Sequence, residues 1–167
     1  MLVTFPKDFL WGGATSGPQT EGRFKKKHDS VFDYDFDHYQ ERFWGALGPD
    51  TASNFFHDFK EDIRLMKEAG LKSLRTSIQW TRLIDDFEKN TVNEQGLAFY
   101  NAVIDECLAQ GIRPMLNLNH FDLPMELMER YGGWESRHVV DLYAKFASVC
   151  FQAFSDRVLD WFTFNEP

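Results

Sequence analysis

A carboxylic acid and an amide stand together at the end of an apolar run, where they could bind and protonate a ligand. Residues 158–164 read as a buried parallel strand, and Asn165 and Glu166 follow directly. Strand ends are where α/β barrels hold their chemistry. Asn165 could hold a hydroxyl, and we expect Trp161 to desolvate Glu166 so that it keeps its proton near neutral pH. Such a proton donor is half of the carboxyl pair that retaining glycosidases place about 5–5.5 Å apart.

Three more polar side chains are expected close to this pair. Gln19 follows the first predicted strand, Arg75 lies within the second, and His120 follows the third. Because parallel strands end on the same side of a barrel, these side chains should converge on one mouth. Amide and imidazole groups suit sugar hydroxyls, which both donate and accept hydrogen bonds. The Arg75 guanidinium would keep a neighbouring nucleophilic carboxylate ionised.

Each of these residues also has a structural explanation when taken alone. Gln19 could bond local backbone, His120 could be a buried core histidine, and Arg75 could form a structural ion pair. Only their convergence favours function. A metal site is not expected, because His57 and Glu61 share a helical face without a further histidine or cysteine.

Apolar periodicity predicts alternating strands and helices. The expected helices are residues 54–69, with Gly70 after them, and two that Asn93 and Ser136 could cap, the first of which ends at Gly111. The expected strands are residues 9–16, 71–80, 112–119 and 158–164. The fold class is therefore α/β.

Four parallel strands could form a small open sheet or about half of a (β/α)8 barrel. An open nucleotide-binding sheet is disfavoured, because residues 11–18 lack the GxGxxG spacing. We therefore expect residues 1–167 to be the N-terminal part of a single barrel. Residues 25–48 should form a long loop over its mouth, with the lysine run 25–27 solvated.

Composition narrows the partners and the compartment. The net charge of −8 argues against nucleic acid or an anionic membrane as partner. Cys107 and Cys150 fall within helical apolar patterns, so we expect buried thiols in a reducing cytoplasm. No stretch approaches the roughly 20 apolar residues of a membrane span, and no basic leader precedes an apolar core. A cytoplasmic protein is the prediction.

Five motifs resemble those of glycoside hydrolase family 1, the family of β-glucosidases and 6-phospho-β-glycosidases. They are FLWGGATS at residues 9–16 with Gln19 and Glu21-Gly22, LRTSIQWTR at 74–82, HFDLP at 120–124, YGGW at 131–134 and TFNEP at 163–167. The resemblance implies a (β/α)8 barrel that hydrolyses β-glycosides with retention of configuration and without a cofactor.

The resemblance also implies roles for individual residues. Glu166 would be the acid/base, and Gln19, His120 and Asn165 would hold hydroxyls of the sugar being transferred, the glycone. Arg75 would lie beside the nucleophile. The family's nucleophile is the glutamate of a later Glu-Asn-Gly motif, which these 167 residues do not contain. The chain alone is therefore expected to be inactive.

One departure from many β-glucosidases bears on the substrate. Phe121 follows His120 where they have tryptophan, and it cannot donate a hydrogen bond to a sugar. Together with RTSI at residues 75–78, Phe121 resembles the branch that acts on 6-phospho-β-glucosides. A plain β-glucosidase is the alternative enzyme, and a non-catalytic sugar-binding half-barrel is the alternative from another class. The aglycone and the oligomeric state stay open.

Overall fold

A computed structural model describes residues 3–167 and contains a four-stranded sheet in the order β1-β2-β5-β6. The strands are β1 (Gly12–Ala14), β2 (Ser73–Ser77), β5 (Arg113–Asn117) and β6 (Asp160–Phe162). Every neighbouring pair is parallel, and spatial order follows chain order. All four strands therefore end on the same side, as predicted.

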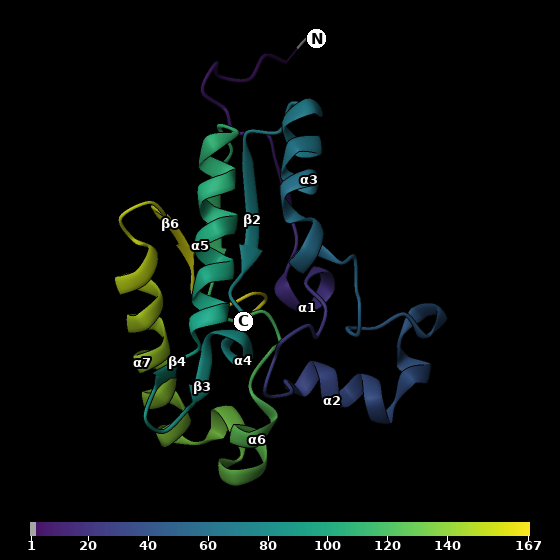
Figure 1. The fold of residues 1–167 in the computed structure, drawn as a ribbon, viewed down its shortest axis with the longest axis vertical. Coiled ribbons are helices and arrows are strands. Elements are labelled where there is room, and N and C mark those ends of the chain that lie inside the picture. Colours follow the sequence, from purple (N-terminus) through teal and green to yellow (C-terminus); the bar gives the residue numbers. More distant parts are fainter. Residues whose placement is uncertain (1–2) are drawn as a thin grey trace.

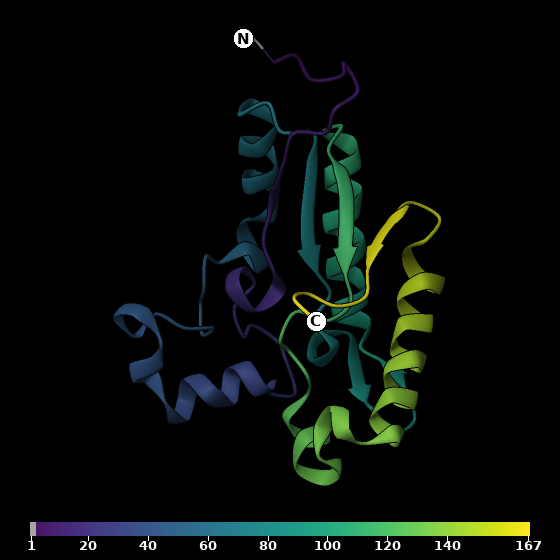
Figure 2. The ribbon, with the colours of Figure 1, turned by 180° about the vertical axis from the view of Figure 1, so that it is seen from behind.

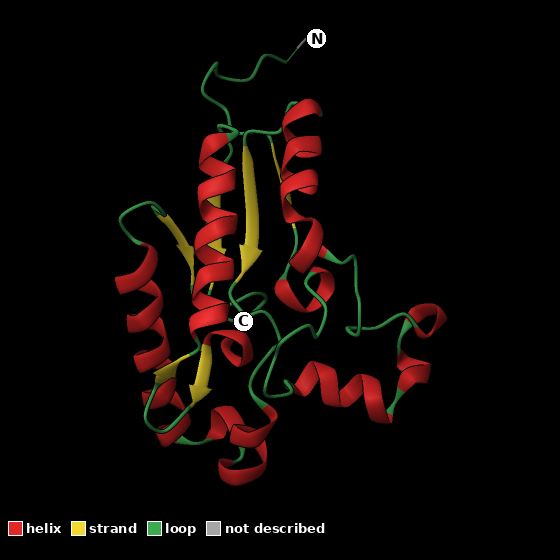
Figure 3. Ribbon diagram, in the orientation of Figure 1, coloured by secondary structure: helices red, strands yellow, loops and turns green. Residues whose placement is uncertain are grey.

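Three long helices cover one face of this sheet (Figures 1 and 3). They are α3 (Phe55–Glu68), α5 (Glu94–Ala109) and α7 (Arg137–Phe154). Seen from behind, the strands lie in front and no helix crosses them (Figure 2). The core between helices and sheet includes the following buried side chains: Phe55, Ile63, Leu74, Ile104, Leu116, Leu142, Phe146 and Phe154.

The three predicted helices are confirmed, and their predicted N-caps differ in bonding. The Asn93 side chain accepts a hydrogen bond from the Gly96 amide and so caps α5. Gly70 follows α3 with a φ of 83°, a conformation that glycine adopts without steric cost. Ser136 is the N-cap residue of α7, as predicted, but within residues 3–167 its side chain makes no capping hydrogen bond.

All four predicted strands are longer than the observed ones, and the first two show why. Only residues 12–14 of the first find partners in β2, and the exposed rings of Phe5, Phe9 and Trp11 pack on one another with 4.7 Å between centroids. The second strand ends at Ser77, because the chain turns into α4 (Trp80–Leu83), where the Trp80 ring stacks on Phe146.

Several shorter elements were not predicted. They are α1 (Gly17–Thr20), α2 (Val31–His38), α6 (Met125–Tyr131), the hairpin of β3 (Ile84–Asp86) and β4 (Thr91–Val92), and the 3-10 turns η1 (Gln40–Arg42), η2 (Trp44–Ala46) and η3 (Gly133–Glu135). The long-loop prediction for residues 25–48 is therefore wrong. Ser30 and Asp33 form a capping box that starts α2, which extends away from the sheet (Figure 1).

Both cysteines are free and buried, as predicted. Burial raises the pKa of the Cys107 thiol to about 12 and that of Cys150 well above its usual range. Among residues 3–167, none of the helices combines the length and the apolar character that a bilayer crossing needs.

Candidate active site

Four of the predicted site residues meet where the strands end. Arg75 projects from β2, and its Nη2 donates a hydrogen bond to Asn165 Oδ1 at 2.9 Å. The Asn165 amide donates to the Asn119 carbonyl at 3.0 Å, which joins the segment after β6 to the segment after β5. His120 lies close enough to Arg75 and Glu166 for both charges to shift its pKa. These four side chains form the mouth of the sheet.

His120 is held as a neutral imidazole. Burial lowers its pKa first and the Arg75 charge lowers it further, while the Glu166 charge opposes them. Asn117 Nδ2 lies 3.4 Å from His120 Nδ1, and because an amide nitrogen donates, we assign Nδ1 as acceptor and place the proton on Nε2. A neutral His120 can then donate from Nε2 to a ligand hydroxyl.

Asp122 secures the loop that carries His120. Its Oδ1 accepts a hydrogen bond from the His120 backbone amide at 2.8 Å, whereas its buried Oδ2 has no hydrogen-bond partner among residues 3–167. Complete burial raises the pKa of Asp122 to about 7. The sequence reading included Asp122 only as part of HFDLP, and its position two residues after a predicted site histidine was the available signal.

One residue of the mouth and one neighbour of it have left-handed backbone conformations. Phe121 has a φ of 63° and Glu166 a φ of 48°. This region costs a non-glycine residue about 1–2 kcal/mol, and such strain gathers at functional sites. The Phe121 ring is 47% exposed and lies edge-on to His120, with 5.3 Å between centroids.

Glu166 is exposed, which corrects one prediction. Trp161 does not desolvate it, because the indole packs edge-on against Phe151 of α7 and its Nε1 donates to the Val158 carbonyl. Side chains alternate between the two faces of a strand, and Trp161 points to the helical face. Within residues 3–167 the Glu166 carboxyl therefore faces solvent.

Gln19 stands apart from the other four residues. It lies on α1, is exposed, and its Oε1 accepts a hydrogen bond from Ser16 Oγ at 2.8 Å. No hydrogen bond among residues 3–167 joins it to Arg75, His120 or Glu166. It lines an open cavity of about 570 Å³ between α1 and the α2–η2 segment. The structure thus leaves Gln19 outside the hydrogen-bonded group.

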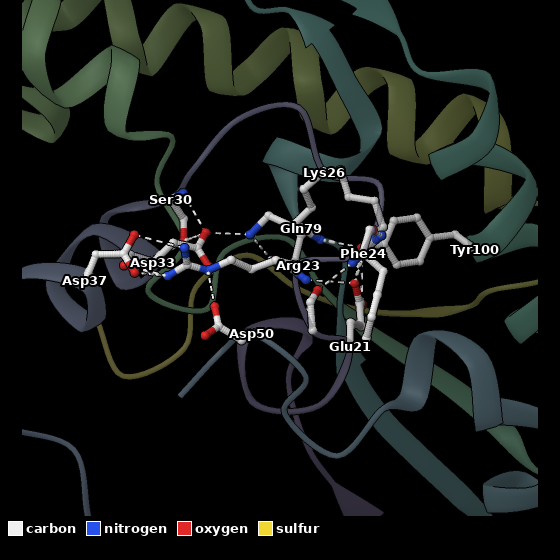
Figure 4. A network of polar contacts seen from close by, with 12 residues as sticks. Glu21, Arg23, Phe24, Lys26, Ser30, Asp33, Asp37, Asp50, Gln79 and Tyr100 are labelled. Atoms are coloured by element: carbon white, nitrogen blue, oxygen red, sulfur yellow. Dashed lines mark hydrogen bonds and ion pairs between the residues drawn. The ribbon is translucent and has the colours of Figure 1, made fainter. Parts of the chain in front are cut away.

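A buried polar network at the C-terminal end of α1 was not identified from the sequence (Figure 4). Glu21 Oε2 accepts hydrogen bonds from Arg82 Nε and from Gln79 Nε2, both at 2.7 Å, and from the Tyr100 hydroxyl at 3.1 Å. The Glu21 and Arg82 side chains are 2% and 1% exposed. This ion pair joins α1 to the segment that continues from β2.

The same network contains Lys26, so the prediction of a solvated lysine run is wrong for this residue. Lys26 Nζ contacts Asp33 Oδ2 at 2.5 Å and Gln79 Oε1 at 2.9 Å, and its side chain is 4% exposed. The capping box of α2 places the Asp33 carboxylate where Lys26 reaches it. Lys27 differs, because it pairs with Asp85 while remaining exposed.

The mouth combines groups that suit a polyhydroxylated ligand. Asn165 and neutral His120 can bind hydroxyls, Arg75 supplies a fixed positive charge, and Glu166 can exchange a proton with a ligand. Within the described part of the chain, no group of three histidine, cysteine or acidic residues is arranged to hold a metal ion.

Comparisons with known proteins identify the relatives of the chain. The sequence model of glycosyl hydrolase family 1 matches residues 1–167. The 6-phospho-beta-glucosidase GmuD of Bacillus subtilis (strain 168) is 47% identical, over 98% of this chain and 35% of its own length. The 6-phospho-beta-glucosidase AscB of Escherichia coli (strain K12) is 41% identical, over 99% of this chain and 38% of its own. The crystal structure of the rice Os3BGlu6 beta-glucosidase superposes with a TM-score of 0.90 at 39% identity, covering 98% of this chain and 34% of that chain.

The chain thus spans about a third of the length of the relatives it matches. The predicted fold class is confirmed, since these structures are barrels of the (β/α)8 type and the chain has the matching parallel strands.

Proposed function

Because the chain belongs to glycosyl hydrolase family 1, we propose that it supplies the acid/base half of a retaining β-glycosidase acting on 6-phospho-β-glucosides. Residues 1–167 would be the N-terminal part of a single barrel. The observation that carries the proposal is the meeting of Glu166 with Arg75, His120 and Asn165 where the parallel strands end. A single carboxyl beside hydroxyl-binding groups is what one half of a double-displacement site requires.

The residues of the mouth would divide the work of the reaction. Glu166 would donate its proton to the leaving oxygen and later take a proton from the attacking water. His120, Asn165 and Gln19 would bind the hydroxyls of the glycone. Arg75 would hold a nucleophilic carboxylate in its ionised form, because a nearby guanidinium favours the charged state. No cofactor takes part in this scheme.

The phosphorylated substrate is supported by Phe121 and by the relatives. GmuD and AscB carry the name 6-phospho-beta-glucosidase, whereas the similar rice structure is a beta-glucosidase. Phe121 presents an exposed ring without a hydrogen-bond donor at the mouth. A plain β-glucosidase is the rival, and hydrolysis of an aryl β-glucoside with and without a 6-phosphate decides between them. Faster hydrolysis of the unphosphorylated compound would overturn the phospho assignment.

The proposal is tested in a barrel that continues this chain with the C-terminal portion of a family 1 enzyme. We expect this barrel to hydrolyse β-linked disaccharides, whose leaving group needs a proton, and Glu166→Gln to lower kcat/KM for them at least about a hundredfold. An unchanged rate would remove Glu166 from the mechanism. The 167-residue chain alone should show no turnover, because it lacks the Glu-Asn-Gly motif; sugar binding without turnover would favour the half-barrel alternative for the isolated chain.

A further inference from the structure

The position of Gln19 must be fixed by something other than its own contacts. Its side chain is exposed and has the Ser16 hydroxyl as its hydrogen-bond partner. Its helix, α1, is four residues long, and a helix this short is not stable by itself. We propose that Glu21 is a positioning residue that orients Gln19 toward the glycone through its buried ion pair with Arg82. This inference rests on the proposed function, because it takes Gln19 as a glycone-binding residue.

Both ends of α1 are fastened to the segment that follows Arg75. At the first residue, the Gly17 amide donates to Ser77 Oγ at 2.8 Å. Directly after the last residue, Glu21 binds Arg82 and Gln79. Ser77 is the last residue of β2, and the other two anchors follow within the next turn. The strand that carries Arg75 therefore also sets the place of Gln19.

The Glu21 carboxylate is fully occupied by protein partners. Besides Arg82 and Gln79, the Tyr100 hydroxyl contacts both of its oxygens, at 3.1 and 3.2 Å. Burial holds the pKa of Tyr100 well above its usual range, so this hydroxyl stays protonated and donates a hydrogen bond to Glu21. These contacts restrict the Glu21 carboxylate and therefore the chain two residues after Gln19.

Arg82 extends the same clamp to the segment after Glu21. Its Nη1 donates to the Phe24 carbonyl at 2.6 Å and its Nη2 to the Gly22 carbonyl at 2.8 Å. The guanidinium lies over the rings of Phe56 and Phe99, at 4.5 and 5.3 Å from their centroids. Replacing Glu21 would therefore detach α1 from Arg82, while Arg82 itself would keep its other contacts.

Close packing at the start of α1 leaves little room for a different position. A Cβ built on Gly17 would lie 2.4 Å from Gln79 Cγ and 3.0 Å from Glu21 Oε1. The turn of α1 thus sits directly on the side chains that bind it. We therefore expect a substitution at Glu21 to displace α1 and with it Gln19, because the packing around α1 leaves no room for a local adjustment.

The test is a double-mutant cycle in the barrel completed with a family 1 C-terminal portion. The variants are Glu21→Gln, Gln19→Ala and their combination. Asp33→Asn is the matched control, because Asp33 is another buried carboxylate of the network, 1% exposed and paired with Lys26, but it lies on α2. Each variant is assayed on an aryl β-glucoside and on its 6-phosphate, for kcat and KM separately.

We expect Glu21→Gln to raise KM about tenfold, with a smaller change in kcat, and to add less than about twofold in the Gln19→Ala background. Asp33→Asn should leave KM within about twofold. The proposal would be overturned if the rise in KM of the double variant equalled the product of the rises of Glu21→Gln and Gln19→Ala. It would also be overturned if Asp33→Asn raised KM as much as Glu21→Gln does. Should Glu21→Gln fail to fold, Glu21→Asp keeps the charge, shortens its reach, and must show the same non-additivity.

A second readout separates this inference from the proposed function. If the completed barrel hydrolyses no glycoside, the proposed function fails, but amide hydrogen exchange in the 167-residue chain still tests the clamp. Glu21→Gln should speed exchange of residues 17–22 more than Asp33→Asn does. Equal protection in the two variants would show that Glu21 does not hold α1.

Discussion

The buried network around Glu21 and the mouth around Glu166 contain the same kinds of side chain. They differ in how many of their hydrogen-bonding groups are already bound to other protein groups. In the network, protein groups occupy the Glu21 carboxylate from three sides, and its side chain is 2% exposed. In the mouth, Glu166 is exposed and Arg75 has one hydrogen bond, to Asn165.

The difference separates structural polar groups from those available to a ligand. A buried charge without a partner is costly, so the network must be complete for the fold to be stable. An exposed charge at a strand end has no such requirement, and its free hydrogen-bonding capacity can serve a substrate. Loss of a network residue should therefore cost stability and change activity only through the position of Gln19, whereas loss of a mouth residue should cost activity directly.

The sharpest contrast compares two arginines that lie close in sequence. Arg82→Met should destabilise the chain by about 3–5 kcal/mol, because it leaves Glu21 as an unpaired buried charge. Arg75→Met should cost less than about 1 kcal/mol, since Arg75 is only half-buried and gives up one hydrogen bond. Urea unfolding of the two variants measures this difference, and equal losses would abolish the distinction between network and mouth.

A second contrast concerns pH and the loop that carries His120. Burial raises the pKa of Asp122 to about 7, above the 3.8 expected when unfolded, so the folded chain binds this proton more tightly. The resulting stability is fully present below about pH 4 and is lost as the pH rises through 7. Asp122→Asn should therefore gain about 1–3 kcal/mol relative to the parent between pH 4 and pH 8. Parallel stability curves for the two proteins would show that Asp122 does not hold its proton.

The smallest effect is expected at an ion pair on the rim of the sheet. Arg113 and Asp160 pair across β5 and β6 with contacts of 2.5 and 3.0 Å, but their side chains are 46% and 30% exposed. Arg113→Ala should cost at most about 1 kcal/mol at low salt, and salt should reduce that loss by screening. A salt-insensitive loss as large as that of Arg82→Met would mean that exposure does not set the worth of these pairs.

The sequence was informative where a local pattern determines the structure. The helices α3, α5 and α7 have apolar residues on one face, and the apolar runs between them became strands of one parallel sheet. Because parallel strands end on the same side of a sheet, the positions of the strands in the sequence predicted that four residues converge: Arg75, His120, Asn165 and Glu166.

The sequence was uninformative where partners far apart decide burial. Glu21 and Arg82 are 61 positions apart, and neither is marked locally as buried. Lys26 stands between Lys25 and Lys27, and nothing in the local sequence distinguishes the three. Only the fold, which brings Asp33 to Lys26, explains why Lys26 is buried and paired. The start of α2 was different, since the spacing of Ser30 and Asp33 is a capping-box signal that could have been used.

The central claim is that Glu166 protonates a leaving oxygen, and the dependence of its effect on the leaving group tests that claim most directly. A poor leaving group, such as a second sugar, needs the proton, whereas an activated nitrophenolate departs without it. In the completed barrel, Glu166→Gln should lower kcat/KM about 10²–10⁴-fold for a disaccharide and far less for the nitrophenyl glucoside, both compared at the same phosphorylation state. An equal loss for both leaving groups would contradict the assignment of Glu166 as the acid.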